Sequence, residues 1–110
     1  MPYNTTHASM KITFKSKKEQ EFYESFDALK KAFNERMAKK IIGRIGDLRD
    51  AENPQLLPRS ARFHPHLGGR RGLFSLDLVD QQRLIVEPTC KYDSYVEITS
   101  VEIYEVVDPH

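Results

Sequence analysis

The pattern of apolar and polar residues in the N-terminal half predicts one strand followed by a helix. Apolar residues alternate with polar ones over residues 9–15, which is typical of a strand with one buried face. From Lys18 the apolar residues recur at spacings of four, three and four, so they share one face of a helix. Asn34 is expected to end this helix, because asparagine tolerates the left-handed conformation. The apolar stripe is formed by Phe22, Phe26, Leu29 and Phe33.

A second helix is predicted directly after the first. Its apolar residues again recur with a helical period, although two glycines within the segment lower its helix propensity. Asn53-Pro54 and Pro58 then end the helical pattern, since a residue that precedes a proline is disfavoured in the helical region. The stripe consists of Met37, Ile41, Ile45 and Leu48, and the glycines are Gly43 and Gly46.

The C-terminal half predicts three strands. Residues 74–79 alternate, residues 80–82 form a short hairpin loop, and residues 83–87 return until Pro88 closes the strand. Residues 95–107 are rich in β-branched side chains, but their alternation slips near Ser100, where a β-bulge is expected. The order β-α-α-β-β-β indicates an α+β fold class, in which two N-terminal helices pack on one face of a small, mainly antiparallel sheet. The opposite face is then free to carry a site.

Length and composition indicate one globular domain over residues 1–110, with residues 1–8 expected to be flexible. The chain has 110 residues, of which 39% are hydrophobic and 30% charged. Cys90 is alone and no zinc-finger spacing occurs, so we expect no disulfide, no metal and no cofactor. No apolar stretch has the length of a signal peptide or a membrane span, so we expect a cytoplasmic protein without a membrane partner.

Charge is unevenly distributed, although the net charge is only +1. Four arginines and two histidines lie between Arg59 and Arg71 without an intervening acid, whereas acidic residues dominate the last twenty positions. The basic segment is the place where a polyanion would be expected to bind.

The residues around this basic segment resemble a known family. The run Arg62-Phe-His-Pro-His-Leu-Gly-Gly-Arg-Arg-Gly-Leu-Phe-Ser75, followed by Gln82-Arg-Leu-Ile85, resembles the HigB-like branch of the RelE/ParE toxin superfamily. That branch has a histidine, a turn with glycine and basic residues, an aromatic residue, a strand and then Arg-Leu/Ile. The resemblance extends over residues 29–33, 38–48 and 101–110, and it implies a RelE-like fold.

The resemblance also implies a function and partners. Such proteins are toxins of type II toxin–antitoxin systems, as in plasmid maintenance, and they cleave messenger RNA on the ribosome and thereby inhibit translation and growth. The partners implied are the ribosome with its messenger RNA and a helix-turn-helix antitoxin of the HigA-like kind. Operator DNA is expected to be bound only through the antitoxin.

Metal-independent RNA cleavage requires groups that move protons and stabilise phosphate charge, which histidine and arginine can supply. The resemblance implies an endoribonuclease whose catalytic residues are His64, Arg71, Arg83 and His110. RNA contacts are expected from Arg62, His66, Arg70 and Tyr104.

Other interpretations of these residues stay open. The histidines can simply solvate a loop, Arg70 and Arg71 can form an edge that faces the antitoxin, and Tyr104 can be a packing residue. Arg83 can form an ion pair with Asp77 or Asp80 instead of binding phosphate. Two other functions are compatible with the sequence: non-catalytic inhibition of DNA gyrase, as in the ParE branch, and a degenerate toxin that only binds antitoxin.

Overall fold

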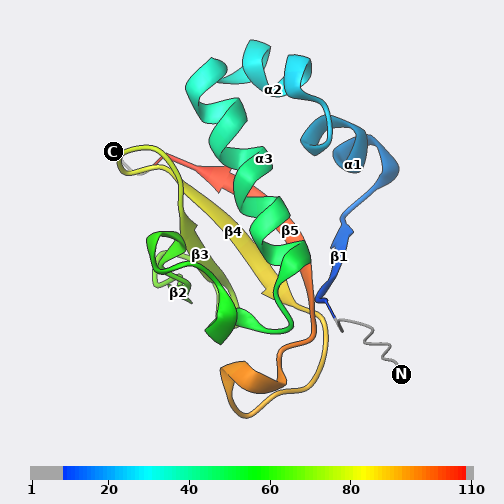
Figure 1. Ribbon diagram of the computed structural model, residues 1–110, viewed down its shortest axis with the longest axis vertical. Coiled ribbons are helices and arrows are strands. Elements are labelled where there is room, and N and C mark those ends of the chain that lie inside the picture. The colour runs from blue at the N-terminus through cyan, green and yellow to red at the C-terminus, as the bar shows by residue number, and fades with distance from the viewer. Residues whose placement is uncertain (1–8, 109–110) are drawn as a thin grey trace, which may run out of the picture.

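A computed structural model describes residues 9–108 as an α+β fold with three helices and a five-stranded sheet (Figure 1). The expected flexibility of residues 1–8 and the role of His110 lie outside the described residues. Short 3₁₀ turns occur at residues 54–56, 59–61 and 95–97. The elements in chain order are β1 (Lys11–Phe14), α1 (Lys17–Tyr23), α2 (Phe26–Ala32), α3 (Glu35–Asp50), β2 (His64–Pro65), β3 (Phe74–Asp77), β4 (Arg83–Pro88) and β5 (Ser100–Val107).

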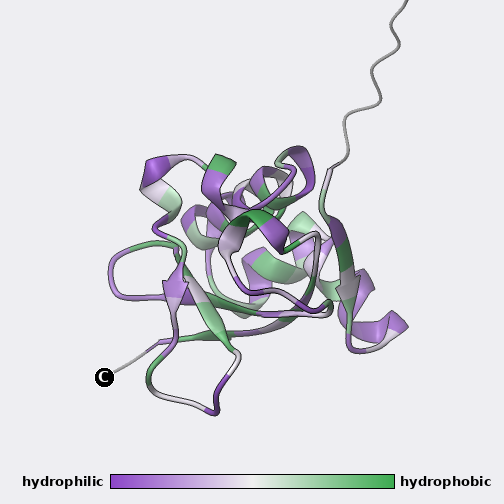
Figure 2. Ribbon diagram, turned by 90° about the horizontal axis from the view of Figure 1, so that it is seen from below, coloured by the Kyte–Doolittle hydropathy of each residue, from purple (hydrophilic) through white to green (hydrophobic). Residues whose placement is uncertain are grey.

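The strands lie in the order β1-β5-β4-β3-β2, so the last strand is inserted between the first strand and the hairpins. β1 pairs with β5 in parallel, and the other three pairs are antiparallel, as expected for a mainly antiparallel sheet. α3 crosses one face of the sheet, α2 lies at the N-terminal end of α3, and α1 lies above β1 (Figure 1). Seen from below, most of the helical turns lie on one side of the strands, and the helix that follows β1 lies beside the edge of the sheet (Figure 2).

The long first helix predicted from Lys18 to Asn34 is wrong, because two short helices occupy this region. Ser25 has extended backbone angles, and its hydroxyl accepts a hydrogen bond from the backbone N–H of Ala28, so it caps α2 instead of continuing α1. Serine competes for backbone groups in this way, which makes it a frequent helix N-cap. The apolar spacing does not reveal this break, because it runs through Ser25 without interruption.

Asn34 also acts differently from the prediction. It has extended backbone angles, not left-handed ones, and its side chain accepts a hydrogen bond from the N–H of Met37 at 2.8 Å. Asn34 therefore begins α3, whereas α2 ends at Ala32. The apolar stripe predicted for α3 is confirmed, since Met37, Ile41, Ile45 and Leu48 are all buried.

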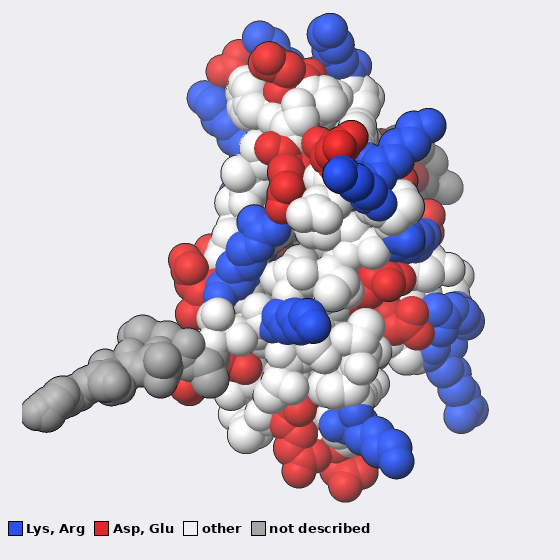
Figure 3. Space-filling model, turned by 90° about the vertical axis from the view of Figure 1, so that its right-hand side faces the viewer, with Lys and Arg blue, Asp and Glu red and all other residues white. Residues whose placement is uncertain are grey.

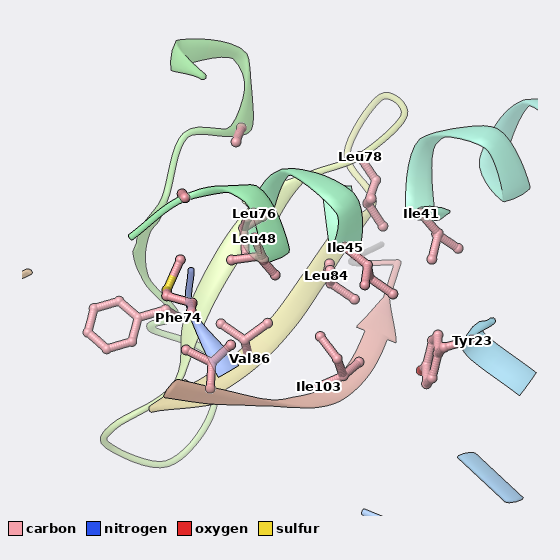
Figure 4. Packing of buried hydrophobic residues seen from close by; sticks show 14 of the residues in the cluster. Tyr23, Ile41, Ile45, Leu48, Phe74, Leu76, Leu78, Leu84, Val86 and Ile103 are labelled. Carbon is pink, nitrogen blue, oxygen red and sulfur yellow. The ribbon is translucent and has the colours of Figure 1, made fainter. Parts of the chain in front are cut away.

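The core lies between α3 and the sheet (Figure 4). Alternate residues of β3, β4 and β5 point to the helical layer and are fully or nearly fully buried, as expected for a sheet with one face on the core. Tyr23 of α1 and Leu29 of α2 complete the cluster. The strand residues of this layer are Phe74, Leu76, Leu84, Val86, Val101 and Ile103.

The final strand is shorter than predicted, and its bulge lies elsewhere. Residues 95–97 form a 3₁₀ turn, so the change of alternation near Ser100 marks the start of β5, not a bulge within it. The register shifts between Ile85 and Val86, which pair with Glu105 and Ile103, and this leaves Tyr104 as the extra residue of a bulge. The bulge sets the position of Tyr104 beside β4.

Within residues 9–108, no helix has both the length and the apolar character needed to span a membrane.

Candidate functional site

The sheet has a second face, opposite α3, which we call the back face. Strand alternation places Ser75 and Asp77 of β3 and Arg83, Ile85 and Glu87 of β4 on it, because their neighbours in sequence belong to the core. Ser75 is opposite Ile85, and Asp77 is opposite Arg83. Ionisable groups of two neighbouring strands are thereby brought together on one surface.

β2, which sequence analysis did not predict, adds a histidine to this face. His64 pairs with Ser75, and residues directly opposite each other in antiparallel strands point to the same face. The Nδ1 atom of His64 is hydrogen-bonded to the backbone carbonyl of Arg62. A carbonyl only accepts hydrogen bonds, so Nδ1 carries the proton and Nε2 of the neutral ring keeps its lone pair.

His66 lies beside His64 on the same face. Its Nδ1 atom is 3.0 Å from the hydroxyl oxygen of Ser75, which is 1% exposed. A Cβ atom added to Gly69 would come within 3.3 Å of the His66 ring and of Leu73, so the absence of a side chain there allows the loop to pack on the imidazole. The glycine turn thus holds His66 against Ser75.

Asp77 contacts both Arg62, which was predicted to bind RNA, and Arg83, which was predicted to be catalytic. Its Oδ2 atom accepts a hydrogen bond from Nε of Arg62 at 2.7 Å, and its Oδ1 atom lies 3.1 Å from Nε of Arg83 in an ion pair without hydrogen-bond alignment. Nη1 of Arg83 also donates to the carbonyl oxygens of Asp80 and Gln82. The ion pair with Asp77 that the sequence left open for Arg83 is therefore present.

Arg44 of α3 supports this cluster from within the molecule. Its side chain is buried, and it donates from Nε to the backbone carbonyl of Asp77 and from Nη2 to that of Ser60, both at 2.7 Å. Nη1 forms an ion pair with Asp47 at 3.1 Å. One buried guanidinium therefore ties α3, the end of β3 and the turn before Arg62 together.

A second cluster on the back face contains Arg70 and Tyr104. Nη2 of Arg70 donates to Oε1 of Glu87 at 2.6 Å, and this hydrogen bond raises the pKa of Arg70 and lowers that of Glu87. Two cations lie over the Tyr104 ring, with the ammonium of Lys15 3.7 Å and the guanidinium of Arg70 5.5 Å from its centre. The cations already contact the ring on which an RNA base was expected to stack.

The predicted site residues are thus gathered in large part on one face. Six of them belong to the back face or contact it: Arg62, His64, His66, Arg70, Arg83 and Tyr104. Arg71 is exposed in the loop and lines a small pocket of about 280 Å³ with His66, Arg70 and Tyr92. No hydrogen bond or ion pair of its side chain occurs within the described part of the chain.

Acids of the sheet offset part of the positive charge of this region. The basic segment contains no acid of its own, yet Asp77 of β3 pairs with Arg62 and Arg83, and Glu87 of β4 pairs with Arg70. The side of the molecule that carries β1 and α1 likewise shows cationic and anionic side chains interspersed (Figure 3). Among residues 9–108, no group of three or more His, Cys, Asp or Glu side chains is arranged to hold a metal ion.

Sequence analysis missed four residues of these clusters as site components: Lys15, Arg44, Ser75 and Glu87. The alternation over residues 74–79 and 83–87 contains the signal for Ser75 and Glu87, because it separates them from the apolar positions. Lys15 and Arg44 become neighbours of the site only through the parallel β1–β5 pair and the crossing of α3. No protein-family model, curated protein or solved structure matches the chain.

Proposed function

We propose that this protein is a toxin of the RelE/ParE superfamily and that it cleaves messenger RNA on the ribosome without a metal ion. The observation that carries the proposal is the gathering of two imidazole and three guanidinium groups on the back face, opposite the helices. These groups are the ones that RNA cleavage requires for proton transfer and phosphate stabilisation. The resemblance of residues 62–75 and 82–85 to HigB-like toxins supports the same function.

The arrangement of the strands is compatible with a RelE-like topology. One strand and the helices precede the antiparallel strands, and β1 joins the sheet by pairing with β5. α3 covers one face of the sheet (Figure 1), and the proposed site residues lie on the other. We therefore propose a RelE-like fold as well as a RelE-like function.

His64 is the proposed general base. Because its Nδ1 proton is bound to the Arg62 carbonyl, Nε2 of the neutral ring can accept the proton of a ribose 2′-hydroxyl. The 2′-oxygen then attacks the phosphorus, while an acid gives a proton to the leaving 5′-oxygen. His66 is the described candidate for that acid, and His110, expected to contribute, lies outside the described residues.

The arginines are the proposed phosphate ligands. Arg62 and Arg83 stabilise the negative charge that develops on the phosphate, and exposed Arg71 and Arg70 contact the flanking backbone. We further propose a cytoplasmic toxin with a HigA-like helix-turn-helix antitoxin as its partner. Operator DNA would be bound through that antitoxin.

The test is messenger RNA cleavage in a purified translation system, with and without ribosomes. We expect His64→Ala and Arg83→Ala each to reduce cleavage by about 100-fold or more, because each removes a group that acts on the reacting phosphate or hydroxyl. Arg36→Ala is the matched control, since Arg36 is an exposed cation on α3, the helix that covers the opposite face. This control should cleave like the unaltered protein.

Cleavage that requires ribosomes, His64 and Arg83 would support the proposal. Growth arrest without cleavage, unaffected by His64→Ala, would instead indicate a non-catalytic inhibitor such as a gyrase-binding toxin. Antitoxin binding without growth arrest would indicate a degenerate toxin.

A further inference from the structure

We infer that Asp77 is a positioning residue, whose half-buried carboxylate holds Arg62 and Arg83 in place to bind one phosphate group. This inference rests on the proposed function only for identifying the phosphate as that of RNA. Asp77 itself does not contact the phosphate. It acts through the two guanidinium groups.

The atoms used in the cluster leave the outer donors of both arginines available. Asp77 engages the Nε atoms of Arg62 and Arg83, and the carbonyls of residues 80 and 82 engage Nη1 of Arg83. Within residues 9–108, no hydrogen bond involves the Nη atoms of Arg62 or Nη2 of Arg83. Guanidinium nitrogens bind phosphate oxygens well when their geometry is fixed in advance.

Burial shows on which side of the arginines the carboxylate lies. The Oδ1 atom of Asp77 is inaccessible to solvent and its side chain is 23% exposed, whereas the Arg62 side chain is 61% exposed. A phosphate that arrives from solvent therefore meets Arg62 more readily than the carboxylate. Arg83 is 22% exposed, so Asp77 and Arg83 lie at a similar depth beneath Arg62.

The backbone around Arg62 and Asp77 is held independently of this carboxylate. Arg62 has a left-handed conformation with φ of 46°, which is unfavourable for a non-glycine residue and persists only where the surrounding structure holds it. Arg44 binds the main-chain carbonyl of Asp77 and that of Ser60, just before Arg62. A change of the Asp77 side chain leaves these hydrogen bonds intact, so it can disturb the arginines without unfolding the loop.

The inference predicts that removal of the Asp77 carboxylate weakens anion binding, although the loss of a negative charge alone would strengthen it. Loss of a negative charge beside two cations should by itself strengthen anion binding. If Asp77 positions the arginines, Asp77→Ala will instead weaken anion binding, because Arg62 loses its hydrogen bond and the two guanidiniums repel each other without the carboxylate between them. Asp77→Glu keeps a carboxylate and should recover part of the affinity.

The experiment measures binding of a short 2′-O-methyl RNA, which cannot be cleaved by its own 2′-oxygen, and separately of inorganic phosphate. The unaltered protein is compared with Asp77→Ala, Asp77→Glu and Asp50→Ala, which removes one exposed carboxylate at the end of α3. NMR signals of the Arg62 and Arg83 Nε–H groups report whether the pair stays ordered. Thermal unfolding of each variant verifies the fold.

We expect several-fold weaker binding of both ligands by Asp77→Ala, partial recovery by Asp77→Glu, and unchanged or tighter binding by Asp50→Ala. Equal or tighter binding by folded Asp77→Ala would overturn the inference, as would failure of the unaltered protein to bind either ligand. If the Asp77-dependent binding is found but ribosomal messenger RNA is not cleaved, the proposed function fails and the positioning role stands. If Asp77→Ala cleaves as well as the unaltered protein, the positioning role fails and the proposed function stands.

Discussion

Arg44 shows how a buried charge can be part of the architecture. Its guanidinium is taken out of water, yet two backbone carbonyls and the Asp47 carboxylate bind its donors. A buried cation is stable only when it is compensated in this way. Arginine is rarely buried unless it is paired, so the residue type alone does not predict this position. The true partners of Arg44 come from residues 60 and 77, far away in sequence.

We predict that Arg44→Ala destabilises the protein by about 2–4 kcal/mol, because the carbonyls of Asp77 and Ser60 lose their donor. Urea-induced unfolding measures this change. Arg49→Ala is the control, since Arg49 forms an exposed ion pair with Glu24 and its loss should cost less than about 1 kcal/mol. Similar losses for the two variants would show that Arg44 is not a structural link.

α3 was predicted with the right apolar stripe, because burial of one face dominates the formation of a helix of this length. The first helix was predicted as continuous because the same criterion ignores capping, and the hydrogen bond of Ser25 decides the break. β2 was missed because two residues do not make a detectable pattern. The histidines and arginines of the site, and Asp77 as a possible partner of Arg83, could be named from the sequence. The pairs Arg62–Asp77 and Arg70–Glu87 could not, because they depend on how the loops before and after β2 lie against β3 and β4.

The two glycines of α3 offer a direct test of its stability. An added Cβ at Gly43 or Gly46 would meet nothing within 4 Å, so alanine fits at both positions. Gly43→Ala and Gly46→Ala should each stabilise the protein by about 0.5–1 kcal/mol, because alanine reduces the conformational entropy of the unfolded chain. Thermal unfolding checks the gain. Gly72→Ala should act in the opposite direction, since Gly72 has φ of 89°.

At the scale of the whole molecule, Tyr23 is buried where α1 meets the sheet. The centre of its ring is 5.0 Å from the centre of the Phe22 ring and 6.2 Å from that of Phe14, the last residue of β1. Burial, with smaller contributions from Glu19 and Glu105, raises the pKa of Tyr23 to about 12. The packing of the helices on the sheet therefore depends on an uncharged phenol.

We predict that the protein loses stability between about pH 10 and pH 12. The unfolded chain ionises Tyr23 near its ordinary pKa of 10, whereas the folded chain keeps the proton up to about 12, so ionisation favours unfolding in this range. The loss should reach about 2 kcal/mol. Urea unfolding at pH 8 and pH 11.5 measures it, with Tyr23→Phe as the comparison. An equal loss in Tyr23→Phe would assign the effect to other groups.

The parallel pairing of β1 with β5 has a consequence for the order in which the chain folds. β5 separates β1 from β4, so Lys11 gains its strand partner only when the segment from Ser100 onward is present. Closing so long a loop is entropically costly, whereas the β3–β4 hairpin needs only its own short turn. During synthesis β1 must wait for β5 to leave the ribosome. The sheet therefore gains its β1 edge only after residues 100–103 have been synthesised and have become free to pair.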